Sequence, residues 1–518
     1  MKRHLPYVVT LFALFLGSLT ICFAENSDNI VRYSQFGAVG DGKTDDFDAI
    51  VKAHEAANAA GKSVQADPQA VYYIGGGNKT AVVQTDTDWG DAKFIIDDTK
   101  VENRNRAVFD VTSRLPVARI KFVKSLKKDQ TKIDFGGELP GKSLISVTDK
   151  NTLRFIRYGL NQNNGTAQTD VFLVDKDGTV DMTTPIIWDF DTITSLEAYP
   201  VDEQTLTLSG GHFTTIANQE ESRYAYYSRG IRITRSNVVV DALKHDVTGE
   251  LDSGAPYGGF ITVSLCANVT VQNCTLTGHK IYRTMGRGGG IVSMGTYDIS
   301  VNRAINTTFR NCRQFNDIND NSRWGIFGSN FCKNILFDNV EFSRFDAHMG
   351  VASATIRNSK LGHQGINLIG TGTFLIENST ASGGAFINLR GDYGSFFDGD
   401  IVIRNCRFVP RNGAKSEAVI VGGSYSGQHD FGYVCRMPHK ITIDGLDIQD
   451  VNVPNNYQGP KIFGNFNSKN TSEQYVETYP YVITEEVEIC NLKTQSGKPY
   501  SVSFNPYMFR NVKITEKK

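Results

Sequence analysis

The chain has 518 residues, of which 40% are hydrophobic and 21% are charged, with 54 basic residues against 55 acidic ones. This composition excludes a disordered tail and a collagen-like fibre, and the near-zero net charge indicates no particular partner. Its 49 glycines against only 14 prolines and 3 tryptophans favour a chain that turns often, as many-stranded β-proteins do.

The first 24 residues are typical of a secretory signal peptide, with a basic start, an apolar stretch at 7–16 and a small-x-small cleavage site ending at Ala24. A lipid anchor on Cys22 is less favoured, because Ile21 stands where a small residue is expected. No other stretch approaches the ~20 apolar residues of a membrane span. We therefore predict a secreted or periplasmic protein without a transmembrane segment, and a lipid-anchored surface protein as the alternative.

The mature chain opens on a glycine- and aspartate-rich segment. Residues 36–50 read Phe-Gly-Ala-Val-Gly-Asp-Gly-Lys-Thr-Asp-Asp-Phe-Asp-Ala-Ile, and the alanine-rich stretch that follows to about Ala60 predicts a helix. The aspartates could form a metal cluster, but Thr44 and Asp45 stand where a helix needs a cap, so a structural role is favoured.

This segment resembles the opening of the pectate-lyase-like right-handed parallel β-helix superfamily, whose members often begin with such a motif and a helix that caps the first coil. The resemblance implies an all-β solenoid, with the cap and first coils in 25–101 and the main β-helix in 206–518. Because lyases, hydrolases, transferases and phage tailspikes share this fold, it leaves the chemistry open.

Residues 102–205 interrupt the solenoid pattern. They contain alternating apolar and polar runs joined by turn residues, at 118–123, 153–158, 171–180 and 185–190. We predict that this stretch is a small antiparallel β-domain inserted between early coils.

From residue 269 onward one phrase recurs: a short strand, a turn residue and another strand. It occurs at 269–276, 308–313, 335–342, 354–361, 374–381, 401–408 and 441–448. The turn residue is Asn or Gly, which tolerate left-handed backbone angles, and it falls at Asn273, Asn311, Asn339, Asn358, Asn378, Asn405 and Gly445. The shortest spacings, 19 and 20 residues, fit one coil of a parallel β-solenoid, and the longer ones fit a coil with an inserted loop.

The mature chain keeps seven scattered cysteines and has no paired CxxC motif, so neither a disulfide framework nor a zinc site is predicted. Three of them, Cys274, Cys312 and Cys406, follow a turn asparagine directly. We predict that most cysteines fill the core and that these three stack on one another.

Equal distances from successive turns predict neighbours in space, because stacked strands lie about 4.8 Å apart. His279 and Asp317 each lie six residues past their turn, His348 lies nine past and His363 five past. We therefore predict one cleft at a single corner of the solenoid. Its candidate catalytic residues are His363, His348, Arg390, Tyr393 and Arg283, and its candidate substrate-binding residues are His279, Tyr282, Arg287, Arg323, Trp324, Asn367, Asn388 and Asp392.

The segment 279–415 carries 16 basic and 10 acidic residues, a positive band in an otherwise acidic chain. Such a band favours a polyanionic partner, and an exported protein without a nucleic-acid-binding motif is better suited to an acidic polysaccharide than to nucleic acid. The predicted function is a polysaccharide lyase that cleaves a uronate polymer, such as pectin or chondroitin sulfate, by β-elimination.

β-Elimination needs a neutraliser for the uronate carboxylate, a base for the C5 proton and an acid for the O4 leaving group. Arginine could neutralise the carboxylate, and so could calcium held by Asp317, Asp320 and Asp346; the sequence leaves both options open. A histidine could serve as the base and a tyrosine as the acid.

Two alternatives remain open. An inverting hydrolase could use Asp317, Asp346 and Asp392 as paired carboxyl groups. The segment Gly362–Gly365, Gly-His-Gln-Gly, resembles part of the polygalacturonase pattern, whose other segments are missing. A non-catalytic glycan-binding protein could use Trp324, Tyr393 and Phe396 as stacking platforms.

Overall fold

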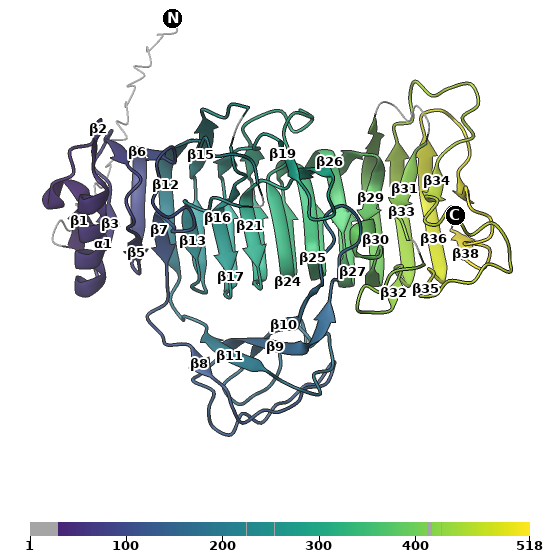
Figure 1. The fold of residues 1–518 in the computed structure, drawn as a ribbon, viewed down its shortest axis with the longest axis horizontal. Coiled ribbons are helices and arrows are strands. Elements are labelled where there is room, and N and C mark those ends of the chain that lie inside the picture. The colour runs from purple at the N-terminus through teal and green to yellow at the C-terminus, as the bar shows by residue number, and fades with distance from the viewer. Residues whose placement is uncertain (1–28, 224, 253, 412–416, 426, 518) are drawn as a thin grey trace, which may run out of the picture.

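The structure is a computed structural model that describes residues 29–517 apart from 224, 253, 412–416 and 426. The predicted signal peptide at 1–24 lies outside the described residues. Parallel strands stack along the whole length of the molecule, and a smaller sheet lies beside the middle coils (Figure 1). Within the described residues, no helix is long and apolar enough to cross a membrane. The right-handed parallel β-helix implied by the opening motif is therefore the fold of this chain.

Each coil contributes to three parallel sheets, which we number 1 to 3. Sheet 1 contains β5 (Ala81–Val83), β7 (Phe109–Val111), β13 (Ile231–Ile233), β16 (Gly258–Ser264), β21 (Tyr297–Asn302), β29 (Ala385–Leu389), β31 (Val419–Gly422), β34 (Lys461–Phe463) and β37 (Ser501–Ser503). Sheet 2 contains β1 (Ile30–Arg32), β3 (Ser63–Gln65), β14 (Val238–Asp241), β17 (Ala267–Gln272), β22 (Ile305–Arg310), β27 (Gly370–Glu377) and β38 (Lys513–Glu516). Sheet 3 contains β2 (Asp41–Asp45), β4 (Val71–Ile74), β15 (Lys244–Thr248), β18 (Thr275–Leu276), β23 (Arg313–Gln314) and β28 (Thr380–Gly383).

Long strands bend around the corners and join the three sheets into one. β6 (Thr87–Asp97), β12 (Leu206–Ile216), β30 (Phe397–Pro410), β33 (Lys440–Ile448) and β36 (Glu486–Thr494) run from sheet 2 to sheet 3. β24 (Phe327–Asp338) runs from sheet 1 to sheet 2, β26 (Lys360–Leu368) runs from sheet 3 to sheet 1, and β25 (Glu341–Arg357) takes part in all three.

The corner between sheets 2 and 3 is made by the predicted turn asparagines. Asn273, Asn311 and Asn339 have φ of 55°, 52° and 56°, in the left-handed region that asparagine tolerates. Their side chains form a ladder, because Asn311 Nδ2 donates to Asn273 Oδ1 at 3.1 Å and Asn339 Nδ2 donates to Asn311 Oδ1 at 2.8 Å. The predicted repeat and its turn chemistry are therefore confirmed here.

A second asparagine ladder, which the predicted repeat does not include, lies at the corner between sheets 1 and 2. Asn268 donates to Asn237, Asn306 donates to Asn268 and Asn334 donates to Asn306, at 2.9 to 3.0 Å. All four residues have φ between 55° and 60°. Two of the three corners of the middle coils are thus fixed by the same combination of backbone angle and side-chain hydrogen bond.

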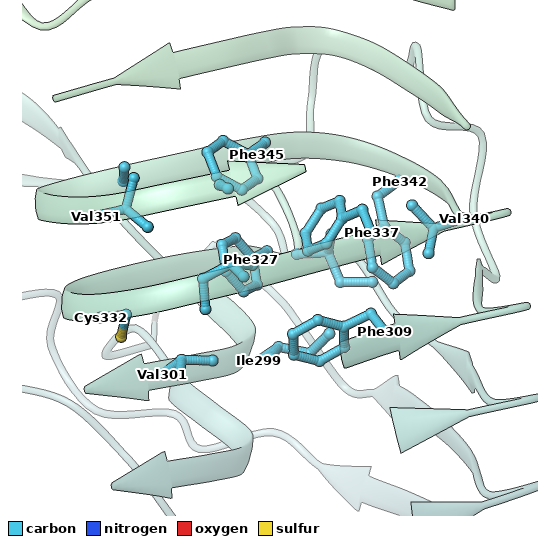
Figure 2. Close-up of a cluster of buried hydrophobic side chains, with 14 of the residues drawn as sticks. Ile299, Val301, Phe309, Phe327, Cys332, Phe337, Val340, Phe342, Phe345 and Val351 are labelled. Carbon is cyan, nitrogen blue, oxygen red and sulfur yellow. The ribbon is translucent and has the colours of Figure 1, made fainter. Parts of the chain in front are cut away.

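Aromatic and aliphatic side chains fill the space between the sheets. Phe327 stacks on Phe345 of the next coil with ring centroids 5.6 Å apart, and Phe309 meets Phe337 edge-on at 5.5 Å (Figure 2). Six of the seven described cysteines are buried in this core, including the three that follow turn asparagines. The prediction that most cysteines fill the core is confirmed.

The N-terminal helix α1 (Phe47–Ala60) closes the first coil with its apolar face, which buries Ile50, Ala53 and Ala57. Asp46 precedes the helix, and its carboxylate accepts hydrogen bonds from the amides of Val39 and Gly40. The acidic opening motif therefore has the structural role that the sequence favours. A short 3-10 helix, η2 (Tyr33–Phe36), lies between β1 and β2.

The inserted strands form a separate antiparallel sheet, as predicted. β9 (Ser143–Arg154) lies between β10 (Thr166–Val174) and β11 (Ser195–Pro200), and β8 (Ala118–Arg119) completes the sheet. The insertion has its own apolar core. It docks through a buried ion pair in which Lys333 Nζ lies 2.8 Å from Asp170 Oδ1. Two smaller pairings, β19 (Tyr282–Met285) with β20 (Ile291–Met294) and β32 (Cys435–Arg436) with β35 (Tyr481–Val482), extend from the coils.

Candidate functional site

A cavity of about 460 Å³ lies on the outer face of sheet 1, under the inserted domain. Its floor is made by β21, β24 and β25, one wall by the β20 hairpin strand, and another by the inserted segment that leads from β9 to β10. We call it the sheet 1 cavity. The side chains that define its chemistry are Arg157, Asn161, Asn163, Tyr226, Arg287, Tyr297, Trp324, Asn330, Arg344, His348, Arg390 and Tyr393.

A buried carboxylate underlies this cavity. Asp346 is fully buried, and it forms ion pairs with Arg344 Nη2 at 2.6 Å and with Arg390 Nη1 at 2.8 Å. Burial alone would raise the pKa of Asp346, but the two guanidinium groups lower it to about 2. Asp346 is therefore ionised and positions two arginines that face the cavity.

A second carboxylate joins the β-helix to the insertion. The short 3-10 helix η3 (Gly391–Tyr393) carries Asp392, which accepts hydrogen bonds from Arg390 and lies 2.7 Å from Arg157 Nη2. Burial favours the neutral acid, yet Arg390 and Arg157 hold the pKa of Asp392 below its ordinary value. This ion pair places an arginine of the inserted domain in the sheet 1 cavity.

A neutral histidine and a tyrosine complete the chemistry. His348 Nδ1 donates to Asn330 Oδ1 at 2.9 Å, so Nε2 carries the lone pair, and it lies 3.3 Å from the hydroxyl of Tyr393. Burial and the nearby Arg390 cation lower the pKa of His348 to about 3, and burial raises the pKa of Tyr393 to about 12. At neutral pH the site therefore presents an uncharged imidazole next to an intact phenol.

Several polar atoms around the cavity remain without a partner. Within the described part of the chain, Arg157 Nε, Asn161 Oδ1, Trp324 Nε1 and Arg344 Nε are buried and make no hydrogen bond. The guanidinium of Arg344 also lies 4.9 Å from the centre of the Trp324 ring. Buried polar groups are nearly always satisfied in folded proteins, so these unpaired atoms indicate a place where a polar partner is missing.

The structure brings together part of the predicted site. His348, Arg390, Tyr393, Arg287 and Trp324 line the sheet 1 cavity, and Asp392 and Asp346 are the ion-pair partners of its arginines. Asn367 and Asn388 continue the same sheet beyond Asp346, at equivalent positions of the next two coils, and are joined by a 2.8 Å hydrogen bond.

The other predicted residues lie elsewhere. His279 is buried, where its Nε2 lies 3.0 Å from Asp298, and Tyr282 is buried against Glu250. His363 is tied to the backbone carbonyls of Ile318 and Arg323. Arg283 is exposed on the outer hairpin, Arg323 lines a different cavity, and Asp317 and Asp320 stabilise the turns of an exposed loop. The prediction that His279, Asp317, His348 and His363 share one wall is therefore wrong.

The unequal loops explain this error. The chain makes a hairpin between Leu276 and Tyr297, whereas the next coil fills the equivalent gap with the irregular loop 315–326. Six residues past its turn, His279 is buried, whereas Asp317, also six residues past its turn, lies in an exposed loop. Equal offsets place residues together only while the chain stays in the regular strands.

The proposed calcium ligands do not fit a calcium site. Asp346 already pairs with two arginines, and Asp320 accepts from Ser322 and lies near Arg323. Among the described residues, no group of three or more His, Cys, Asp or Glu side chains is arranged to hold a metal ion. The donor set of this cavity is cationic, which suits an anionic ligand instead.

Arg157, Tyr297, Asn330 and Arg344 are among the cavity residues that are absent from the predicted site. Arg344 could be predicted, because Arg344, Asp346 and His348 occupy every second position of β25. Every second residue of a strand points to the same face of its sheet. No pattern points to Arg157, since it reaches the cavity from the inserted domain.

No family model matches this chain. Among curated proteins, it is 34% identical over 118 residues to a protein named as a capsule KL64-specific depolymerase from Klebsiella phage P510, which covers 18% of this chain. The chain spans about a tenth of the length of that relative, 11%.

Two solved structures share the fold along most of the chain. The tailspike gp61 of Pseudomonas phage phi297 matches with a TM-score of 0.52 and 14% identity, covering 90% of this chain and 80% of that one. The Gp54 tailspike of Acinetobacter baumannii bacteriophage AP22, solved in complex with a capsular saccharide of its host, matches with a TM-score of 0.50 and 11% identity, covering 94% and 79%. At this identity the similarity concerns the fold.

Proposed function

We propose that the protein is an exported polysaccharide lyase that cleaves a uronate-containing anionic polysaccharide by β-elimination in the sheet 1 cavity. The observation that carries this proposal is the pairing of a cationic arginine cluster with a neutral His348 and an intact Tyr393 phenol. One comparison names a capsule-specific depolymerase and another a tailspike in complex with a capsular saccharide, and both are consistent with a polysaccharide substrate.

The arginines supply recognition of the carboxylate. Arg157, Arg344 and Arg390 line the cavity. Arg390 donates to Asp346 and Asp392 through all three of its nitrogens and supplies charge, whereas Arg157 and Arg344 each keep an Nε donor without a partner for the carboxylate. Neutralising the uronate carboxylate also acidifies the proton at C5, because charge that develops on the carbon is delocalised toward that carboxylate. A cavity of this composition therefore both selects the substrate and prepares the reacting carbon.

The elimination then needs one base and one acid. His348 Nε2 takes the C5 proton, the C4–O4 bond breaks with its electron pair leaving on O4, and a double bond forms between C4 and C5. Tyr393 donates its phenol proton to the departing oxygen. Proton transfer from the imidazolium to the phenolate across the 3.3 Å contact restores both groups. A bound uronate also offsets the repulsion by Arg390, which raises the basicity of His348 in the complex.

The carboxyl groups argue against the hydrolase alternative. Hydrolysis by paired carboxyls needs one protonated carboxylic acid with a raised pKa. Both carboxyl groups at this cavity, Asp346 and Asp392, have lowered pKa values and bind arginines. Neither is suited to donate a proton at neutral pH.

The test is an assay of the purified protein on polygalacturonate, alginate, chondroitin sulfate and a uronate-containing capsular polysaccharide. We expect ultraviolet absorbance from an unsaturated uronate to rise in step with new reducing ends for at least one polymer. Reducing ends without absorbance would support the hydrolase alternative. Binding without either product would support a non-catalytic glycan-binding protein.

A further inference from the structure

A second cavity, of about 770 Å³, lies on the outer face of sheet 3. We call it the sheet 3 groove. Its floor follows equivalent positions of successive coils, from His212 to Lys244 to Thr275. Its other chemically distinctive residues are Asp246, Glu250, Lys280, Phe315, Asn316 and Arg323. None of these residues lines the sheet 1 cavity.

An exposed aromatic ring is the first sign of a ligand. Phe315 follows β23 and is 71% exposed, although burial of a phenylalanine side chain is energetically favourable. Asn316 and Arg323 line the same groove, and their amide and guanidinium groups are held in place by hydrogen bonds to Thr277 and to the backbone of Gly278. An apolar ring surrounded by polar groups suits a sugar, which has an apolar C–H face and hydroxyl groups at its edge.

One lysine of the groove can pair with an anionic sugar. Lys244, Lys280 and Arg323 line it, and its two carboxylates are already paired. Asp246 lies 2.6 Å from His212 Nε2, and Glu250 accepts a hydrogen bond from Tyr282. Lys280 lies 3.2 Å from Asp252, and Arg323 lies 3.3 Å from Asp320, so Lys244 is the lining cation for which the described part of the chain shows no ion pair.

A thin wall separates the two cavities. It consists of two short segments, 279–281 and 322–324, whose backbones are joined by hydrogen bonds from Trp324 N to His279 O at 2.9 Å and from Ile281 N to Ser322 O at 3.1 Å. Consecutive residues of this wall face opposite ways, since Arg323 lines the sheet 3 groove and Trp324 lines the sheet 1 cavity. A chain-like ligand that leaves one cavity over this wall enters the other.

We propose that the sheet 3 groove is a distal binding site for the anionic polysaccharide, which holds the part of the chain that extends past the wall from the sheet 1 cavity. This inference rests on the proposed function for the identity of the polymer. Phe315 stacks against a sugar ring, and Lys244 pairs with an acidic group of the polymer. The groove then adds affinity for long chains and leaves the chemical step unchanged.

The test compares two double variants with the parent protein. Phe315→Ala with Lys244→Ala removes the exposed ring and a cation from the groove, and Phe122→Ala with Lys124→Ala makes the same changes at an exposed position of the inserted domain. Affinity electrophoresis measures binding to polygalacturonate, alginate, chondroitin sulfate and a uronate-containing capsular polysaccharide, with neutral dextran as the blank.

We expect the groove variant to bind the preferred polymer about ten-fold more weakly and the inserted-domain variant to bind like the parent. Where turnover is measurable, KM for the polymer rises and kcat for a short oligosaccharide stays within about two-fold. Equal binding by all three proteins overturns the proposal, as does binding of no anionic polymer by the parent. Weakened binding by the groove variant without any turnover supports the groove and overturns the proposed lyase, so the two ideas fail separately.

Discussion

The hydroxyl oxygen of Tyr393 lies 3.3 Å from Nε2 of His348, and the opposite nitrogen of the same ring is held by Asn330 at 2.9 Å. These two contacts fix the tautomer of the His348 imidazole, so that the lone pair of Nε2 faces the Tyr393 phenol in the arginine-lined cavity. The two residues are 45 positions apart in the sequence, on β25 and η3.

Replacing Tyr393 by Phe removes the proposed acid while keeping the ring. We expect the rate of unsaturated product formation to fall by roughly 10²–10⁴-fold, the usual contribution of a positioned proton donor. Because the ring still packs edge-on against Phe155, thermal unfolding should change little. A variant that keeps more than about a third of the parent rate would remove Tyr393 from the mechanism.

The pKa values of His348 and Tyr393 in the unliganded protein predict that activity changes little with pH around neutrality. The pKa of His348 is lowered to about 3 and that of Tyr393 is raised to about 12, so neither group changes its protonation state between these limits. We expect kcat/KM, which reports the free enzyme, to stay constant from about pH 5 to about pH 9. An acidic limb near pH 6.5, the ordinary value of histidine, would contradict His348 with a lowered pKa as the base.

The regular part of this fold could be predicted because it rests on local backbone chemistry. Every coil needs a left-handed residue at its corner, so Asn311 and Asn339 mark the repeat in the sequence itself. The cavity could be predicted only in part, since its residues come from unequal loops. Arg157 in particular is paired with Asp392, which lies more than two hundred residues away in the sequence. No local sequence pattern indicates that contact.

The asparagine ladder predicts a specific order of stability among variants at one corner. Asn311→Ala removes two side-chain hydrogen bonds and places a Cβ-bearing residue without a local hydrogen bond at φ of 52°. We expect a loss of about 2–4 kcal/mol in the free energy of unfolding. Asn311→Gly loses the same hydrogen bonds but accepts the backbone angle, so it should be about 1 kcal/mol more stable than the alanine variant. Equal stability of the two variants in urea unfolding would show that the backbone angle contributes nothing.

The buried carboxylate of Asp346 predicts a pH-dependent difference in stability. Its pKa is about 2 in the folded protein against an ordinary value of 3.8, so the ionised group contributes about 2 kcal/mol above pH 4, and this contribution is lost as the pH falls through 2. Asp346→Asn should lose this contribution, leave the buried Arg344 without its carboxylate and leave Arg390 with Asp392 alone, for a total of about 3–5 kcal/mol at pH 7. The gap between the two proteins should narrow on acidification, and a gap that stays constant from pH 7 to pH 3 would contradict the assignment.

The buried ion pair between Lys333 and Asp170 predicts how the inserted domain is attached. Both side chains are about 2% exposed, and Lys333 also donates to the carbonyl of Pro185, so the amine joins a coil of the β-helix to two parts of the insertion. Lys333→Met leaves the Asp170 carboxylate buried without its cation, and we expect it to cost about 3–5 kcal/mol.

The double variant Lys333→Met with Asp170→Leu removes both charges, and we expect it to recover at least half of that loss, because an apolar pair of similar volume carries no desolvation cost. Since the insertion supplies Arg157 to the sheet 1 cavity, the single variant should also weaken polymer binding, and the double variant should restore it. Binding that is unchanged in the single variant would show that the cavity is assembled independently of this contact.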